Sequence, residues 1–184
     1  MIAIGNSPLG LDCVLGLGSN LGQRQMMLAA GVRALGKLGK LVAVSALYES
    51  AAVGPEQPDY LNAAVRLKTK LGAEELLEEL HRIEVASGRV RRERWGPRTL
   101  DLDILWILGL VLKKSGLTVP HPELPKRLFA LLPLLDVAPE AKDELGRPYA
   151  AMASELDATV VRRLPRTHSG GWLLPPTTLP PPFS

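Results

Sequence analysis

The alternation of carboxylates with apolar residues between positions 100 and 106 constrains the fold of this chain most strongly. If the segment is an extended strand, successive side chains point to opposite faces of a sheet. Asp101 and Asp103 would then share a solvent-facing side. The opposite, apolar side would consist of Leu100, Leu102, Ile104 and Trp106. A half-buried strand accounts for this pattern by itself, so the two acids do not yet require a function.

The spacing of the two acids is nevertheless suited to a hard cation. Carboxylates that lie close together on one face of a strand repel each other unless a cation sits between them. Mg²⁺ prefers a few carboxylates together with water molecules and substrate phosphates. We therefore predict that Asp101 and Asp103 bind metal.

A cationic segment immediately precedes this strand. Gly88, Gly96 and Pro97 interrupt it, so it cannot form a regular helix. Such a run is most often a solvated surface, but beside two acids it favours a site for a polyphosphate and its metal. Its five arginines are Arg89, Arg91, Arg92, Arg94 and Arg98.

The composition is that of one compact globular domain. The 184 residues are 46% hydrophobic and 22% charged, which is enough to bury a core. The net charge is only +3, and the basic excess is concentrated in one loop, which predicts a small polyanionic partner rather than a nucleic acid. The lone cysteine, Cys13, excludes an internal disulfide and suits a reducing compartment.

Targeting patterns point to the cytoplasm. The first cationic side chain is Arg24, whereas a secretory signal begins with a positive region. No apolar run approaches the ~18 residues that are needed to span a bilayer. We therefore expect a cytoplasmic protein with no membrane partner.

Hydrophobic periodicity predicts short strands and amphipathic helices in alternation. Strands are expected at 13–17, where a Gly-Ser-Asn turn follows, at 41–48 and at 63–69. Helices are expected at 23–38 and 74–86. Together with the acidic strand, this order predicts an α+β, ferredoxin-like sandwich, in which helices pack on one face of a mainly antiparallel sheet.

Three parts are expected along the chain. Residues 1–11 would form an irregular N-terminal extension, 12–162 the compact domain and 163–184 a Pro-rich flexible tail. Additional C-terminal helical segments are expected at 127–137, broken or restarted at Pro133. Two aromatic side chains of the tail are candidates to dock on the body, Trp172 and Phe183.

Four collinear blocks carry a resemblance to a known family. They are LGLGSNLG (15–22), SALYESAAVGPEQPDYLNAAV (45–65), LLEELHRIEVASGRVRRERWGPRTLDLDIL (76–105) and VPHPELPKRLFALLPLLDVAPE (119–140). The chain resembles the 6-hydroxymethyl-7,8-dihydropterin pyrophosphokinases of folate synthesis, and WGPRTLDLDIL is the most specific part of the match. The resemblance implies a ferredoxin-like fold. It also implies transfer of the terminal diphosphate of MgATP to the pterin hydroxymethyl oxygen, with release of AMP.

The resemblance implies a nucleotide half of the site. In the family, the aspartate pair bridges two Mg²⁺ ions on the phosphates of ATP, which is the co-substrate. The residues that match its catalytic contacts are Arg89, Arg98, Asp101 and Asp103. The residues that match its nucleotide contacts are Glu84, Arg89, Arg91, Arg94, Arg98, Ile104, His121 and Arg127. Arg91 and Arg92 are interchangeable in this assignment, because the loop is one residue shorter than in some relatives.

The resemblance also implies a flat slot for the pterin. The ring faces of Tyr60 and Phe129 would sandwich the bicyclic ring, and Asn62 would read its amide and amine edge. Ser50-Ala51-Ala52 stands where relatives commonly have Thr-Pro, so this loop lacks a fixed backbone angle. The residues that match pterin contacts are Ser50, Val53, Tyr60, Asn62, Trp95 and Phe129.

Other functional classes are less consistent with the sequence. It contains neither a P-loop pattern nor a kinase glycine loop followed by its lysine, so we interpret the glycines of LGLGSNLG as a strand-end turn. A non-catalytic ferredoxin-like scaffold is opposed by the intact acidic pair. An RNA-binding module would expose aromatic residues on central strands, where this chain has Val65 and Leu67. We expect a monomer or a weak homodimer.

Overall fold

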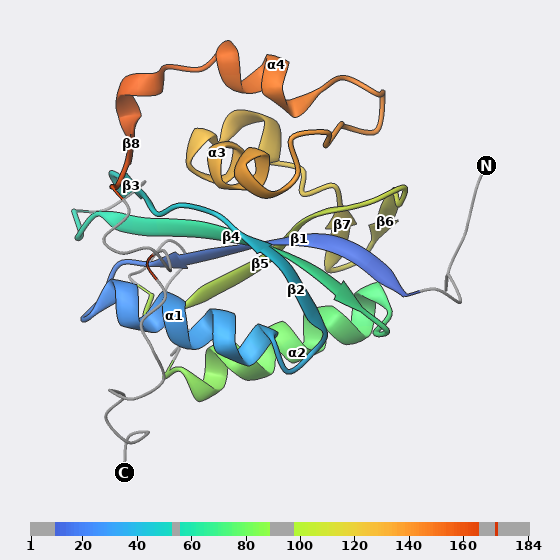
Figure 1. Cartoon of the computed structure of the whole chain (residues 1–184), viewed down its shortest axis with the longest axis horizontal. Coiled ribbons are helices and arrows are strands. Elements are labelled where there is room, and N and C mark those ends of the chain that lie inside the picture. Colours follow the sequence, from blue (N-terminus) through green and yellow to red (C-terminus); the bar gives the residue numbers. More distant parts are fainter. Residues whose placement is uncertain (1–9, 53–55, 89–97, 166–171, 173–184) are drawn as a thin grey trace.

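The computed structural model describes residues 10–52, 56–88, 98–165 and 172. Within these residues a six-stranded antiparallel sheet has the order β5-β1-β4-β3-β8, and β2 also pairs with β4 (Figure 1). Its strands are β1 (Leu11–Ser19), β2 (Lys40–Val44), β3 (Tyr48–Ser50), β4 (Tyr60–Thr69), β5 (Asp101–Ile107) and β8 (Val161–Arg163). A separate hairpin consists of β6 (Leu112–Lys114) and β7 (Leu117–Val119).

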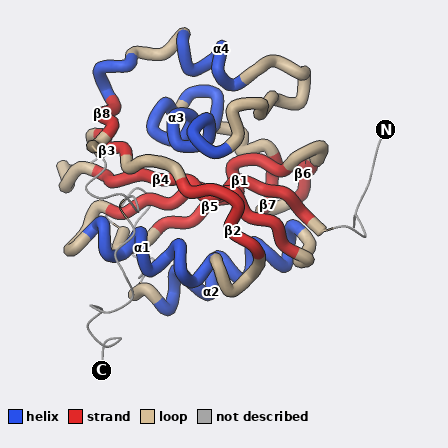
Figure 2. The backbone as a smooth tube through the Cα atoms, viewed as in Figure 1, coloured by secondary structure: helices blue, strands red, loops and turns tan. Residues whose placement is uncertain are grey.

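Helices cover both faces of the sheet. The helices α1 (Arg24–Leu35) and α2 (Ala73–Ala86) lie on one face, and α3 (Leu128–Val137) and α4 (Tyr149–Ser154) lie above the other (Figures 1 and 2). Short 3-10 turns are η1 (Leu124–Lys126) and η2 (Ala158–Val160). The predicted α+β ferredoxin-like order and the added C-terminal helices are therefore confirmed. The prediction that helices pack on one face holds for α1 and α2, whereas the added helices α3 and α4 lie above the other face. None of the described helices is long and apolar enough to cross a membrane.

Alternation along the central strand β1 divides the core between these two layers. Cys13, Leu15 and Leu17 are buried against the side of α1 and α2. Val14 is buried with Ala64 on the side of α3. Because successive residues of a strand face opposite sides, one strand serves both apolar layers. This explains why β1 reads as a nearly continuous apolar run.

The predicted face of Trp106 is wrong. Ile104 lies opposite Leu15, whereas Trp106 lies opposite Val14, so β5 contains one extra residue relative to β1. This bulge reverses the alternation. Leu105 and Trp106 therefore both pack on the side of α3, and Trp106 donates its indole N–H to the Lys142 carbonyl at 3.0 Å.

The predicted break at Pro133 is also wrong, because α3 continues through this residue. A proline inside a helix removes one backbone hydrogen bond. Here Leu131 and Leu134 are fully buried on either side of it. Their packing, together with the buried proline itself, offsets the loss.

The segment predicted as one strand at 41–48 is two strands, β2 and β3, separated by residues 45–47. The Ser45 hydroxyl accepts a hydrogen bond from the Ala64 amide at 2.8 Å, and the Ala46 amide donates to Asp136 Oδ2 at 2.9 Å. Side chains thus take over bonds that a continuous ladder would make between backbones. The apolar pattern carries no sign of this exchange.

The C-terminal segment differs from the flexible tail that was predicted for 163–184. Arg163 belongs to β8, which pairs with β3. Trp172 is only 5% exposed and packs in the core beside α1 and α2. At these described residues, the chain is therefore built into the fold.

Candidate active site

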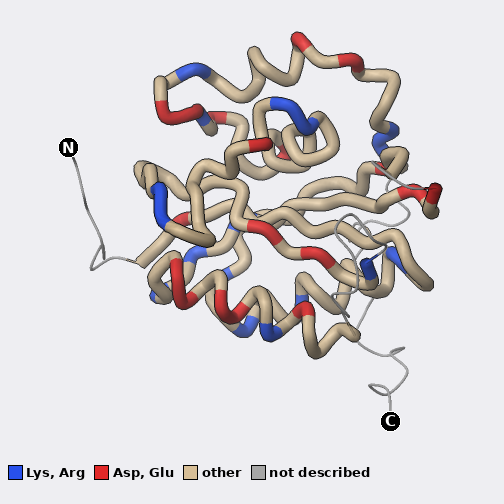
Figure 3. The backbone as a smooth tube through the Cα atoms, turned by 180° about the vertical axis from the view of Figure 1, so that it is seen from behind, with Lys and Arg blue, Asp and Glu red and all other residues tan. Residues whose placement is uncertain are grey.

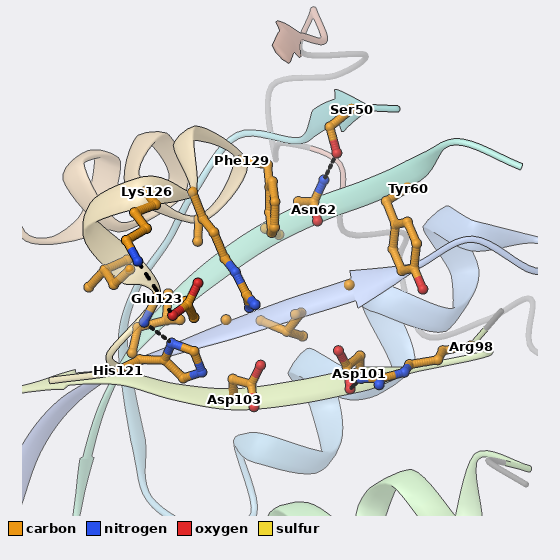
Figure 4. A pocket seen from close by; sticks show the side chains of 18 of the residues that line it. Ser50, Tyr60, Asn62, Arg98, Asp101, Asp103, His121, Glu123, Lys126 and Phe129 are labelled. Atoms are coloured by element: carbon orange, nitrogen blue, oxygen red, sulfur yellow. Dashed lines mark hydrogen bonds and ion pairs between the residues drawn. The ribbon is translucent and has the colours of Figure 1, made fainter. Parts of the chain in front are cut away.

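A cavity of about 530 Å³ lies on the α3 side of the sheet. β1, β4 and β5 form its floor, and η1 and α3 form one wall (Figure 4). The predicted site residues that line it are Ser50, Tyr60, Asn62, Arg98, Asp101, Asp103, His121, Arg127 and Phe129. Residues separated by up to about eighty positions in the sequence therefore meet in one place. Val53, Arg89, Arg91, Arg94 and Trp95 lie outside the described residues.

The two predicted metal ligands share one face, as expected. Asp101 and Asp103 both project from β5 into the cavity (Figure 4). Burial raises the pKa of the Asp103 carboxyl, and repulsion from Asp101 raises it further. Asp101 forms an ion pair with Arg98. The pair thus concentrates negative charge, and the described cationic neighbours Arg98 and Arg127 lower the pKa of Asp103 without cancelling its upward shift.

The donor set fits Mg²⁺. Among the described residues there is no group of three or more histidine, cysteine or carboxylate side chains that could enclose a metal ion. Two carboxylates alone leave most of an octahedral coordination shell to water and phosphate oxygens. This arrangement suits a metal that arrives with a nucleotide rather than one held in a closed structural site.

The glycines of LGLGSNLG have a role that the sequence analysis missed. The interpretation as a strand-end turn is wrong for Gly16 and Gly18, because both belong to β1 and line the cavity opposite Asp103 and Asp101. A Cβ atom on Gly16 would lie 3.1 Å from the Leu105 side chain. Beside the acids, β1 therefore contributes backbone without side chains, and at Gly16 the Leu105 side chain packs where a Cβ would lie.

His121 lies beside Asp103 at one end of the cavity (Figure 4), and its backbone N–H donates to the Leu105 carbonyl of β5 at 2.9 Å. Burial lowers the pKa of its imidazole, although the nearby Asp103 carboxylate acts in the opposite direction. The Glu123 amide donates a hydrogen bond to its Nδ1 at 3.2 Å. A neutral ring that accepts at Nδ1 carries its proton on Nε2. His121 is thus prepared to donate one hydrogen bond to an anionic ligand.

Three further charged side chains line the wall formed by η1 and the start of α3. Arg127 was predicted from the family resemblance, whereas Glu123 and Lys126 were not. Lys126 Nζ lies 3.9 Å from Glu123 Oε1. An isolated Lys or Glu in a loop carries no sequence signal of its own, because such residues are ordinarily solvated.

The other end of the cavity is polar and aromatic. Tyr60 and Phe129 both line it, and Asn62 lies near both (Figure 4). The Asn62 amide donates to the Ser50 hydroxyl at 3.0 Å and to the Tyr48 carbonyl at 3.3 Å. These bonds fix the orientation of the Asn62 side chain, which is only 6% exposed.

Two residues with predicted nucleotide roles do not line the cavity. Glu84 is 1% exposed, and its Oε1 accepts a hydrogen bond from the Leu102 amide of β5 at 2.8 Å. The Ile104 side chain packs in the core on the side of α1 and α2. As placed here, Glu84 supports the outer edge of β5, and Ile104 could contact a nucleotide through its backbone only.

Asn20 connects segments on both sides of the cavity, and the sequence analysis did not identify it. This residue is 1% exposed, and its Oδ1 accepts a hydrogen bond from the Arg98 amide at 2.7 Å. Its Nδ2 donates to Gln57 Oε1 at 2.9 Å and to the Pro58 carbonyl at 3.1 Å. A buried amide whose donors and acceptor all have partners fixes the segments that it joins.

Known proteins match this chain over most of its length. A model of the 7,8-dihydro-6-hydroxymethylpterin-pyrophosphokinase (HPPK) family matches residues 14–139. A 2-amino-4-hydroxy-6-hydroxymethyldihydropteridine pyrophosphokinase from Synechocystis is 38% identical over 172 residues, which are 91% of this chain and 88% of that protein. The Haemophilus influenzae protein of the same name is 43% identical over 149 residues, 79% of this chain and 91% of its own.

Solved structures share the fold. Wild-type Plasmodium falciparum HPPK-DHPS, crystallised with pterin and p-hydroxybenzoate, matches with a TM-score of 0.64 at 16% identity. The match covers 84% of this chain and 44% of the Plasmodium chain. At this identity the likeness concerns the fold alone.

Proposed function

The chain belongs to the 7,8-dihydro-6-hydroxymethylpterin-pyrophosphokinase family, and on this premise we propose how its cavity divides between two substrates. The protein transfers diphosphate from ATP to the hydroxymethyl group of 6-hydroxymethyl-7,8-dihydropterin in folate biosynthesis. The function implied by the four sequence blocks is therefore confirmed. The division of the cavity rests on the chemistry of the residues that line it.

The ATP phosphates occupy the end of the cavity that contains the acidic pair. Asp101 and Asp103 would hold two Mg²⁺ ions, which would neutralise phosphate charge and so favour attack on the β-phosphorus. Arg98 and Arg127 approach the same space, and a guanidinium remains charged at any physiological pH. His121 donates its Nε2 proton to a phosphate oxygen.

The pterin occupies the opposite end. Asn62 offers its Oδ1 as an acceptor, because its Nδ2 already donates to Ser50 and Tyr48, and an amide oxygen can read a donor group on the edge of a heterocycle. Tyr60 and Phe129 provide ring faces for stacking. With the pterin held there, its hydroxymethyl group points along the floor toward the phosphates.

The transfer requires positioning more than specialised side-chain chemistry. A bond forms between the hydroxymethyl oxygen and the β-phosphorus, and the bond from that phosphorus to the oxygen retained by AMP breaks. The hydroxyl proton is released to solvent. Holding both substrates in one cavity makes the encounter intramolecular, and fixed cationic groups stabilise the charge that develops.

A single observation carries this proposal: the acidic pair and the Asn62–Ser50 pair lie in one continuous cavity (Figure 4). An RNA-binding role is not favoured, because α3 covers the sheet face that such modules expose (Figure 1). A cytoplasmic location, the absence of a nucleic-acid partner, and a monomer or weak homodimer are proposed from the sequence alone.

Separate substrate titrations test the division. Asn62→Ala is expected to raise the Kd of the pterin about tenfold and leave the Kd of Mg²⁺ α,β-methylene-ATP unchanged, because only one substrate loses a hydrogen-bonded edge. Asp103→Asn is expected to lower kcat by about a hundredfold or more while pterin binding persists. If both variants weakened both ligands equally, the division would be wrong.

A further inference from the structure

The C-terminal segment extends the sheet directly beside the proposed pterin end. β8 pairs antiparallel with β3, with Val161 opposite Ser50 and Arg163 opposite Tyr48. The ladder is continued by the Leu164 amide, which donates to the Leu47 carbonyl at 2.8 Å. β3 is only three residues long and would otherwise be an edge strand. Without β8, half of its backbone groups would lack a strand partner.

Ion pairs reinforce this junction. Arg24 NH2 lies 2.9 Å from Glu49 Oε1, and Arg162 pairs with the other carboxylate oxygen of Glu49. The hydrogen bond from Arg162 is the main reason that the pKa of Glu49 is lowered. Glu49 is flanked in β3 by Tyr48 and Ser50. Both of these neighbours accept a hydrogen bond from the Asn62 side chain, which lines the cavity.

Trp172 makes a second set of contacts close to β3. Its indole Nε1 donates to the Ser45 carbonyl at 2.8 Å, and Gln25 Nε2 donates to the Trp172 carbonyl at 3.0 Å. Ser45 lies in the interruption between β2 and β3, where the strand has no regular ladder. A buried aromatic ring with a bonded N–H contributes both apolar area and fixed direction.

We infer that residues Val161–Leu164 together with Trp172, here called the C-terminal brace, position the pterin end of the active site. The brace fixes β3, β3 fixes the Ser50 hydroxyl, and Ser50 fixes the amide of Asn62. Among the described residues, the hydrogen bonds and ion pairs of the brace reach β3, residues 45–47, Gln25 and Asp136. None of these is Asp101, Asp103 or His121, so we expect its effect to be specific to the pterin. It lies beyond residues 14–139, which the family model matches. The inference rests on the proposed pterin role of Asn62.

Full-length point variants test the brace. Trp172→Ala removes the anchor, and Arg162→Glu repels Glu49 without altering the core. Each is expected to raise the pterin Kd about fivefold, because a loosened side chain must be ordered again when the ligand binds. The Kd of Mg²⁺ α,β-methylene-ATP should stay within about twofold. Trp172→Phe keeps most of the ring and should give a smaller change.

Trp106→Phe is the matched control. It also removes a hydrogen bond from a buried indole to a carbonyl, but on β5 under α3. It should lower Tm without changing the ratio of the two Kd values. If Asn62→Ala weakens pterin binding but the folded variants Arg162→Glu and Trp172→Ala do not, the proposed role of the brace would be wrong. If Asn62→Ala has no effect either, the pterin assignment itself fails, and the inference fails with it.

Discussion

The folded protein destabilises the ionised form of the Asp103 carboxyl. Burial and the neighbouring Asp101 both raise the pKa of its carboxyl. If the site binds Mg²⁺ only together with the nucleotide, the repulsion between the Asp101 and Asp103 carboxylates is expected to persist until both bind. Ionised Asp103 therefore reduces the stability of the metal-free protein, and we expect divalent ions with nucleotide to remove that penalty.

The pH dependence of stability in the metal-free protein should show the raised pKa of Asp103. A raised pKa in the folded state means that ionised Asp103 is less stable there than in the unfolded chain. Stability should therefore fall as pH rises from its ordinary pKa of 3.8 toward the raised value. Asp103→Asn is expected to raise Tm at pH 7 in the presence of a chelator, measured by thermal unfolding. A lower Tm would show that the carboxylate is stabilising.

The imidazole of His121 gives a second test at the scale of single residues. Its pKa should lie below 6.5, and the largest influence that opposes this shift is the charge of Asp103. In Asp103→Asn the imidazolium loses that favourable partner, so the pKa of His121 should fall further. NMR titration of the ring protons measures both values. An unchanged or higher pKa in the variant would contradict the placement of these two side chains.

At the scale of elements, the features that could be predicted were those marked by a pattern of hydrophobic residues along the sequence. The compact apolar run of β1, the alternation in β4, the apolar stripe of α2 and the order of elements all follow from the sequence pattern. The bulge at Leu105, the interruption at Ser45 and the intact helix at Pro133 do not, because each depends on a tertiary partner. The bulge changes the packing rather than the direction of Leu105, since it turns Trp106 to the α3 side of the sheet, where Leu105 already lines the cavity.

Variants of Glu84 test whether α2, which lies outside the cavity, stabilises the strand β5 that lines it. Its carboxylate accepts from the Leu102 amide at the free edge of β5. Glu84→Ala leaves that amide without this partner and should lower the free energy of unfolding by about 1–3 kcal/mol, measured in urea. Glu84→Gln keeps an acceptor and should cost less. If Glu84→Gln instead weakened nucleotide binding at unchanged stability, the residue would act at the nucleotide.

At the scale of the whole molecule, the site arises from layering. Helices α1 and α2 fill one face of the sheet, and α3 covers only part of the other, which leaves the cavity at its edge (Figures 1 and 2). Viewed from behind, acidic and basic positions are interspersed over the helices and loops, and two acidic positions follow one another along one strand of the sheet (Figure 3). Diphosphate transfer from a magnesium nucleotide needs this proximity of opposite charges.

The family motifs identified nine of the nineteen residues that line the cavity, but they did not identify Asn20 or Trp172, which support it. Asp101, Asp103 and Asn62 belong to blocks that were recognisable along the chain. Asn20 and Trp172 act through hydrogen bonds to distant residues, Arg98 and Ser45. Such partners are set by the packed fold and leave no local pattern in the sequence.

The most direct test of the central claim is a crystal structure with Mn²⁺ and α,β-methylene-ATP, in which anomalous scattering locates the metal. We expect two Mn²⁺ ions, each bound by Asp101 or Asp103 and by phosphate oxygens, with the adjacent pterin end still open. Metal found only on phosphate oxygens, with both carboxylates turned away from it, would contradict the account.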